Sequence, residues 1–267
     1  MNSDNHKPVI ELWENALKEK TYKPPAIGRW SRKNFEYLSR SWRRILKHTG
    51  IKRTDNIRAL EFGSGEGHKL IPLYIKGWDC VGIDCSEDAT HRAKQYLIGV
   101  DKYFSDTGNI ELKTMDFLKY EPPGDLFDIT FQFGVLEHFL DETERKKYLI
   151  KMFDCTRPGG FVVSWVPNGC HFYREKQREK KLGGYNIPEI DYTEEKIRSE
   201  LEEFGCSSIV VLPYDLFGYL NIIPASIPLK VFFKMIYLFF QLPVFQFLPK
   251  KLLLTHSYSF LAIAQKI

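Results

Sequence analysis

The chain has 267 residues, of which 43% are hydrophobic and 27% are charged, and its formal net charge is +4. This length suits one large domain with its own core, and the composition excludes a disordered chain. The five cysteines form no C-x-x-C pair, the histidines are scattered, and the first residues contain no apolar stretch. We therefore expect a cytoplasmic protein with reduced thiols and no metal.

The first 54 residues are predicted to form a helical cap, with Trp42 and Ile45 on an apolar stripe. Residues 18–58 carry thirteen Lys or Arg against three acids, and 174–181 form a second basic run. Such runs are usually solvated helix faces, and the alternative is a surface for anions. Aromatic side chains here usually lie in the core, and basic ones in solvent. The less common uses are a lid over a ligand, for Tyr22, Trp30 and Phe35, and a partner for a ligand's carboxylate, for Arg29 or Arg32.

From residue 57 onward, apolar runs alternate with amphipathic stretches, which predicts a doubly wound α/β sheet. The expected strands are 57–62, 79–84, 110–115, 127–133, 160–166, 207–213 and 257–265. The expected helices are 67–76, 87–98, 142–154 and 193–204. We expect a core of residues 55–212 and 255–267, interrupted by an apolar helical insertion at 213–254.

Several local signals refine these boundaries. Ser86 and Asp141 are suitable N-caps for the helices that follow them. Pro158-Gly159-Gly160 predicts a turn before the apolar run "FVVSWV". The fourth strand alternates Phe and Ile with Asp128, Thr130 and Gln132, although a buried parallel strand is usually apolar on both faces. One face of this strand is therefore expected either to meet polar helix side chains or to be partly wet.

The stretch "RALEFGSGEGHKL" places Gly63, Gly65 and Gly67 between the first strand and the next helix. Glycine allows positive φ and a close approach of the backbone to a ligand, although a tight turn alone would also explain the glycines. The dinucleotide fingerprint would need a glycine at position 68, where the chain has His68. The pattern therefore favours a ligand other than a dinucleotide.

Three acids lie at or just after the ends of successive strands and indicate what that ligand is. Glu61 would suit a cationic amino group and would repel a phosphate. Asp84 lies about twenty residues after the glycines, where an acid can accept from both ribose hydroxyls. Asp116 can accept from an adenine amino group while apolar neighbours face the ring. Together the three acids indicate a ligand that has an amino group, a ribose and an adenine.

This combination resembles the class I S-adenosylmethionine-dependent methyltransferases. "FDITFQFGVLEHF" and "RPGGFVVSWVPN" are similar to that family's fourth- and fifth-strand motifs, and the resemblance covers about 55–212 with the last strand at 257–265. It is closest to the small-molecule branch that includes the ubiquinone-biosynthesis methyltransferases. The resemblance implies a Rossmann-like seven-stranded sheet in the order 3-2-1-4-5-7-6, with the seventh strand antiparallel.

The resemblance also implies S-adenosylmethionine as cofactor, with no metal, and assigns residues to its parts. Those lining the methionine part would be Glu61, Gly63, Ser64 and Gly65. Asp84 would hold the ribose, and Cys85 would follow it against the adenosine. Met115, Asp116 and Phe117 would frame the adenine, while Phe133, Gly134 and Val135 would pass beneath the methionine and sulfonium.

A hydroxyl acceptor needs a base, and His138 is the candidate catalytic residue. A lone His beside Glu137 more often orders a loop, and His171 is a second, weaker candidate. The fourth strand ends in Gln132-Phe133-Gly134-Val135 rather than [DN]-P-P-[YFW], which argues against nucleic-acid base methylation.

The insertion at 213–254 is rich in Phe and Leu, with lysines at its ends, and Gln and Pro interrupt its longest apolar stretch. It suits a membrane interface or a cap over an apolar substrate slightly better than a dimer face. Two functions follow. The first is methyl transfer, O-directed by preference, to a small apolar or lipid-linked acceptor, with possible peripheral contact at the inner membrane face. The alternative is an S-adenosylmethionine-binding protein without catalysis that acts as a partner or regulator.

Overall fold

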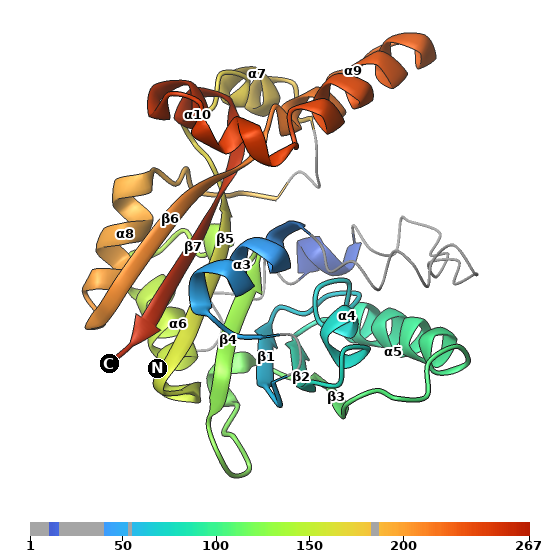
Figure 1. Cartoon of the computed structure of the whole chain (residues 1–267), viewed down its shortest axis with the longest axis vertical. Helices are drawn as coiled ribbons and strands as arrows, with labels where there is room; N and C mark the ends of the chain where they lie inside the picture. The colour runs from blue at the N-terminus through green and yellow to red at the C-terminus, as the bar shows by residue number, and fades with distance from the viewer. Residues whose placement is uncertain (1–10, 16–39, 53–54, 183–186) are drawn as a thin grey trace.

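The computed structural model describes residues 11–15, 40–52, 55–182 and 187–267 (Figure 1). These residues build one mixed sheet in the order β3-β2-β1-β4-β5-β7-β6, with β7 antiparallel to both neighbours. This is the predicted Rossmann-like sheet, and the order and direction of its strands are confirmed. The strands are β1 (Arg58–Phe62), β2 (Asp79–Asp84), β3 (Ile110–Thr114), β4 (Phe127–Phe133), β5 (Thr156–Pro167), β6 (Cys206–Leu216) and β7 (Ser257–Lys266).

Helices cover both faces of the sheet and create two cores. On one face pack α3 (Arg40–Thr49), α4 (Ile71–Tyr74) and α5 (Glu87–Asp101), and on the other α6 (Glu142–Cys155) and α8 (Glu194–Glu202). Residues 11–15 are also helical. The remaining elements are η2 (Phe117–Lys119), η3 (Leu136–His138), α7 (Arg174–Glu179), η4 (Gly218–Asn221), α9 (Ile227–Phe239), η5 (Pro243–Phe247) and α10 (Lys250–His256).

Both predicted N-caps are confirmed, because Ser86 accepts from the Ala89 N–H and Asp141 from the Glu144 N–H. Two of the boundaries that differ from the prediction have a local cause. The helix expected at 67–76 is only the four residues of α4, since turns occupy 67–70. The turn expected at 158–160 lies inside β5, which already pairs at Thr156, and a register shift against β4 absorbs the extra residues.

Two of the three polar side chains of β4 are buried, and they bond mainly to backbone groups. Thr130 Oγ1 lies 3.2 Å from the Met152 carbonyl oxygen and 2.7 Å from Thr156 Oγ1. Gln132 Oε1 accepts from the Val135 N–H at 2.9 Å, and its amide donates to the Trp165 carbonyl. Thr130 and Gln132 are fully buried. The expectation of a partly wet face is therefore confirmed at Asp128, which is half-buried and pairs with Arg157 at 2.7 Å, whereas Thr130 and Gln132 bond to main-chain groups and a strand hydroxyl.

The apolar insertion begins later than predicted, because β6 continues to Leu216. Since β6 and β5 both run antiparallel to β7, β6 ends at the same edge of the sheet as the parallel strands. The insertion, with α9 and α10, therefore extends from the edge where β1 and β4 also end (Figure 1). No helix in the described ranges is long and apolar enough to cross a bilayer.

Candidate functional site

The turn after β1 forms a cradle of main-chain groups beside β2. The N–H groups of Gly63 and Ser64 both donate to the Ile83 carbonyl oxygen, at 2.8 and 3.0 Å. Gly63, Gly65 and Gly67 all have positive φ, at 69°, 51° and 77°. Only glycine adopts this conformation at little cost, so the turn requires all three glycines.

The three glycines differ in what surrounds them. A Cβ on Gly63 would lie 2.3 Å from Val135 Cγ2, and one on Gly67 would lie 2.8 Å from Ile71 Cδ1. A Cβ on Gly65 would meet no atom of the described residues within 4 Å. Packing therefore explains Gly63 and Gly67, whereas Gly65 borders open space that a ligand can occupy.

Asp84 joins this turn to the start of α5. One carboxylate oxygen accepts from the Gly65 N–H at 2.7 Å, and the other accepts from the Ser86 N–H at 2.8 Å. Burial raises the pKa of Asp84, while these main-chain donors act against that rise. Each carboxylate oxygen retains a second lone pair, so Asp84 can hold the turn and still accept from a ribose.

Glu61 lies at the end of β1 and is buried, with only 2% of its surface exposed. Its Oε2 has no hydrogen-bond partner among the described residues. Burial raises the pKa of Glu61 well above its usual range, and the positive charge of Lys69 opposes the rise. The Lys69 ammonium itself lies 4.8 Å from the centre of the Phe133 ring. A buried carboxyl with a free oxygen matches the cationic amino group that the sequence predicts here.

The residues predicted to frame an adenine follow β3 directly. The Met115 N–H donates to the Asp84 carbonyl oxygen at 2.9 Å, so this segment adjoins the ribose side of the cradle. Asp116 caps η2 through the Leu118 N–H at 3.0 Å. The Phe117 ring packs 4.4 Å from the Tyr148 ring, centre to centre, and so also belongs to the core. Burial raises the pKa of Cys85 to about 12, so this thiol is no nucleophile near neutral pH.

The segment after β4 closes the other side of the cradle. Gly134 has a φ of 79°, and its N–H donates to the Trp165 carbonyl oxygen at 3.1 Å. Val135 packs against Gly63 so closely that a Cβ on this glycine would lie 2.3 Å from Val135 Cγ2. Gln132 anchors the backbone at Val135, and so fixes the start of η3.

His138 lies in η3, and its hydrogen bond determines which ring nitrogen carries the proton. Its Nδ1 is 3.0 Å from the Pro188 carbonyl oxygen, which can only accept, so Nδ1 carries the proton and Nε2 is the basic nitrogen. Burial lowers the pKa of His138, so the ring is neutral near pH 7. The Trp13 ring lies edge-on at 5.4 Å. This arrangement is suitable for accepting a proton.

Two acids adjoin His138. Burial raises the pKa of Glu137 to about 8, and Glu137 Oε2 has no hydrogen-bond partner among the described residues. Possible ligand atoms of Glu137, His138 and Glu189 lie within 4.8 Å of one another. However, Glu189 is already paired with Arg174 at 2.6 Å, which supplies a positive charge to the group. The expectation of a metal-free site stays a prediction.

Other sequence candidates are used differently. His171 is buried, stacks on Tyr219 and has a pKa lowered to about 4 by burial, so it is part of an aromatic cluster. In the basic run 174–181, Arg174 is buried and pairs with Glu189 and Asp191, which makes it structural. The candidates Tyr22, Arg29, Trp30, Arg32 and Phe35 lie outside the described residues.

Four residues that contact the candidate site were not predicted from the sequence to do so: Trp13, Lys69, Gln132 and Pro188. The one local signal is the polar side chain of Gln132 in a largely apolar strand, and the sequence alone does not show what this side chain bonds to. Trp13 and Pro188 reach His138 from segments far away in the chain, so no local pattern predicts their contact.

Comparisons with known proteins identify the family and the fold. The family described as methyltransferase domain matches residues 34–209. No curated protein matches the sequence. Magnesium protoporphyrin IX methyltransferase from Synechocystis PCC 6803, solved with SAH, is similar at 14% identity and a TM-score of 0.59, covering 99% of this chain and 100% of that one.

Two further structures share the fold. An S-adenosylmethionine-dependent methyltransferase from Archaeoglobus fulgidus is 16% identical with a TM-score of 0.54, over 90% of this chain and 100% of that one. The N-methyltransferase NodS from Bradyrhizobium japonicum WM9, in complex with S-adenosyl-L-homocysteine, is 16% identical with a TM-score of 0.52, over 95% and 97%. At these identities the likeness establishes a common fold.

Proposed function

This chain belongs to the methyltransferase domain family and is S-adenosylmethionine-dependent, and we propose that it transfers the methyl group to a hydroxyl oxygen of a small apolar acceptor. The observation that carries the proposal is the cradle around Gly65. It combines open space over a main-chain turn, a ribose acceptor at Asp84 and a buried carboxyl with a free oxygen at Glu61.

These residues fit the cofactor part by part. Glu61 would receive the ammonium of the methionine end, and Asp84 would accept from the ribose hydroxyls. Asp116 and Met115 would border the adenine. The φ values of the glycines already have the form that a close approach requires, so the cradle is preorganised. Nothing in this set resembles a phosphate clamp.

When bound, the cofactor supplies an activated methyl group on its sulfonium. The chain's own residues hold the acceptor in line and exclude water, and such positioning can account for about 7–11 kcal/mol of a barrier. His138 Nε2 would take the hydroxyl proton, because Nδ1 is committed to the Pro188 carbonyl. Charge left on the ring would be stabilised by Glu189 nearby.

The surroundings of His138 favour an apolar acceptor. Trp13 lies edge-on to the imidazole, and the partly buried Val135 borders the same segment. An apolar, flat or lipid-like acceptor carrying one hydroxyl would bury against these side chains, and each large apolar group buried contributes about 1.5–3 kcal/mol. An anionic acceptor would fit poorly here, because the carboxyl groups of Glu137 and Glu189 adjoin His138.

The test uses S-adenosylmethionine with a labelled methyl group, offered with extracted lipids and with a panel of small phenols. We expect label in the organic phase with the native protein. His138→Gln should lower transfer about 10²–10⁴-fold and leave cofactor affinity by calorimetry unchanged. His91→Gln, on the exposed surface of α5, is the matched control and should behave like the native protein.

Two outcomes would contradict the proposal. Tight cofactor binding without transfer to any acceptor would leave the non-catalytic alternative. Native-like transfer by His138→Gln would remove the base role and leave His138 as a residue that orders its loop.

A further inference from the structure

Helix α9 presents an apolar face that the described residues leave open to solvent. None of its residues is buried, and six large apolar side chains are 50–80% exposed: Ile227, Val231, Phe232, Met235, Leu238 and Phe239. At about 100° per residue they occupy one side of the helix. Tyr237 lies on another side and holds the helix to the body, since it hydrogen-bonds Asp215 at 2.6 Å and Arg40 at 2.7 Å. The attachment of α9 therefore leaves its apolar face free.

Lysines border this face. Lys230 and Lys234 are one turn apart on α9, between the apolar side and the side that carries Tyr237. Neither has an ion-pair partner within the described part of the chain. η5, which follows α9, carries another exposed apolar side chain, Phe247, which is 80% exposed. An exposed apolar stripe with lysines at its border is the pattern of a helix that lies in a membrane interface.

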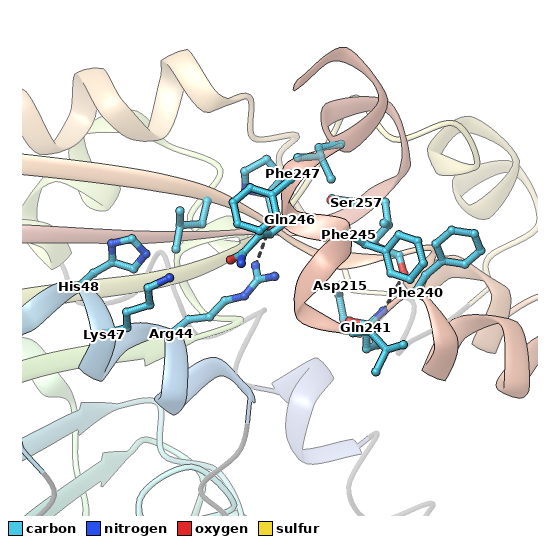
Figure 2. Close-up of a pocket in the computed structure, with 15 residues that line it drawn as sticks. Arg44, Lys47, His48, Asp215, Phe240, Gln241, Phe245, Gln246, Phe247 and Ser257 are labelled. Atoms are coloured by element: carbon cyan, nitrogen blue, oxygen red, sulfur yellow. Dashed lines mark hydrogen bonds between the residues drawn. The ribbon is translucent and has the colours of Figure 1, made fainter. Parts of the chain in front are cut away.

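A cavity of about 290 Å³ lies beside this surface, between α3 and the segment that follows α9 (Figure 2). Arg44, Lys47 and His48 enter it from α3, and Phe240 and Phe245 are among the side chains that line it from the insertion. It therefore has a cationic part and an aromatic part, as a site for an anionic amphiphile would.

The two cations of the cavity, Arg44 and Lys47, have no ion pair with any carboxylate in the described residues. Asp215 also lines the cavity, but its Oδ1 accepts from Tyr237 and lies 3.9 Å from Arg40. Burial lowers the pKa of His48, and the charges of Lys47 and Arg44 lower it further. Positive charges that repel one another would be relieved by an anion bound among them.

We propose that the α9 face and this cavity together dock the protein on a bilayer that contains anionic lipids. The apolar side chains of α9 and η5 would enter the boundary between headgroups and acyl chains, and a lipid phosphate would bind among Arg44, Lys47 and His48. A second copy of the chain fits less well. In a two-fold dimer the same patch faces itself, so its lysines would meet like charges.

This docking would bring the protein's catalytic edge toward the lipid, because β6 ends at the edge where β1 and β4 also end. The inference does not require His138 to be the base or the acceptor to be a lipid. Cofactor binding, measured on the same preparations, therefore separates a failure of docking from a failure of the proposed function.

The experiment is flotation of the full chain with vesicles of neutral phosphatidylcholine, and with vesicles that contain about one third phosphatidylglycerol. We expect flotation with the anionic vesicles only, weakened by high salt. Phe232→Ser/Phe239→Ser should abolish it, while the matched control Ile98→Ser, an exposed apolar residue on α5, should float like the native protein.

The cavity is tested by a second pair of variants. Lys47→Ala should lower the apparent affinity for anionic vesicles about five-fold, which corresponds to about 1 kcal/mol per basic residue near such a surface. Arg43→Ala is the matched control, because Arg43 is an exposed neighbour on α3 that does not line the cavity, and it should have a smaller effect. Free inorganic phosphate is added in a parallel arm, and millimolar phosphate that releases the vesicles would mean an anion site without a lipid preference.

Three results would overturn the proposal. They are no flotation by a native protein that binds the cofactor, equal flotation with neutral vesicles, and a stable dimer in solution that Phe232→Ser/Phe239→Ser dissociates. The last result would identify the α9 face as a contact between copies.

Discussion

Gly65 shows how a single residue separates a ligand site from an ordinary turn. Gly63 and Gly67 are explained by the side chains against them, Val135 and Ile71, and would be needed without any ligand. Gly65 has positive φ, donates its N–H to Asp84 and borders empty space. The sequence alone presents the three glycines as equivalent, and only the packing around them distinguishes their purposes.

We predict that Gly65→Val abolishes S-adenosylmethionine binding and leaves the protein folded. The added side chain would fill the space left for the cofactor, and the left-handed backbone would cost about 1–2 kcal/mol. Gly205→Val is the matched control, because Gly205 also has positive φ and nothing within 4 Å of its Cβ position, but lies in the turn before β6. Calorimetry should show binding by Gly205→Val only. Equal binding by both variants would show that Gly65 serves the turn alone.

The buried carboxyl of Glu61 predicts a pH dependence of cofactor binding. Burial raises the pKa of Glu61 well above its usual range and so favours the protonated carboxyl in the free protein, whereas an arriving ammonium favours the ionised form. Binding should therefore release a proton, and affinity should fall as the pH is lowered. Calorimetry in buffers of different ionisation enthalpy measures this release. Glu61→Gln should bind more weakly and release fewer protons, whereas unchanged proton release would exclude Glu61 as the source.

At the scale of whole elements, the succession of strands and helices along the chain could be predicted, because hydrophobic periodicity is a local signal. The order and direction of the strands in the sheet were implied by the resemblance to the methyltransferase family. The turn that became part of β5 and the shortened α4 could not, because pairing with β4 and the glycine turns decide those boundaries. The candidate site divides in the same way. Glu61 and Asp84 lie at the ends of β1 and β2, and Asp116 follows β3, so their position in the chain made them candidates. Trp13 and Pro188 reach His138 through tertiary contacts, which no local pattern predicts.

Gln132 links β4 to η3 and is therefore predicted to matter for both stability and transfer. Gln132→Leu would leave the Val135 N–H without its 2.9 Å acceptor and should lower the free energy of unfolding by about 1–3 kcal/mol. With its anchor lost, η3 should hold His138 less well, so transfer should fall more than cofactor affinity does.

Thr130→Val is the control for this variant, because Thr130 is equally buried on the same strand but bonds to Met152 and Thr156, away from η3. Denaturant unfolding of both variants should give losses of similar size. If Thr130→Val reduced transfer as much as Gln132→Leu, the effect would reflect stability alone.

At the scale of the whole molecule, large apolar side chains near the two ends of the chain differ in how far the fold buries them. Trp42 on α3 is fully buried, lies 4.8 Å from the Phe131 ring, and donates from its indole to the Lys69 carbonyl oxygen at 3.0 Å. It therefore ties the N-terminal helix both to the sheet and to the segment that follows the glycine turn. Phe239 on α9 is equally apolar but 57% exposed, so its apolar surface stabilises the isolated chain little.

We predict that Trp42→Ala lowers the free energy of unfolding by about 3–5 kcal/mol, the range for truncating a buried aromatic side chain. Phe239→Ser should change it by less than about 0.5 kcal/mol, as exposed positions usually do. Denaturant titration followed by circular dichroism measures both. Cofactor affinity should fall for Trp42→Ala, because Lys69 and its neighbours lose their support, and should be unchanged for Phe239→Ser. A large stability loss in Phe239→Ser would mean that α9 belongs to the core of the folded protein, and its exposed face would then need no partner.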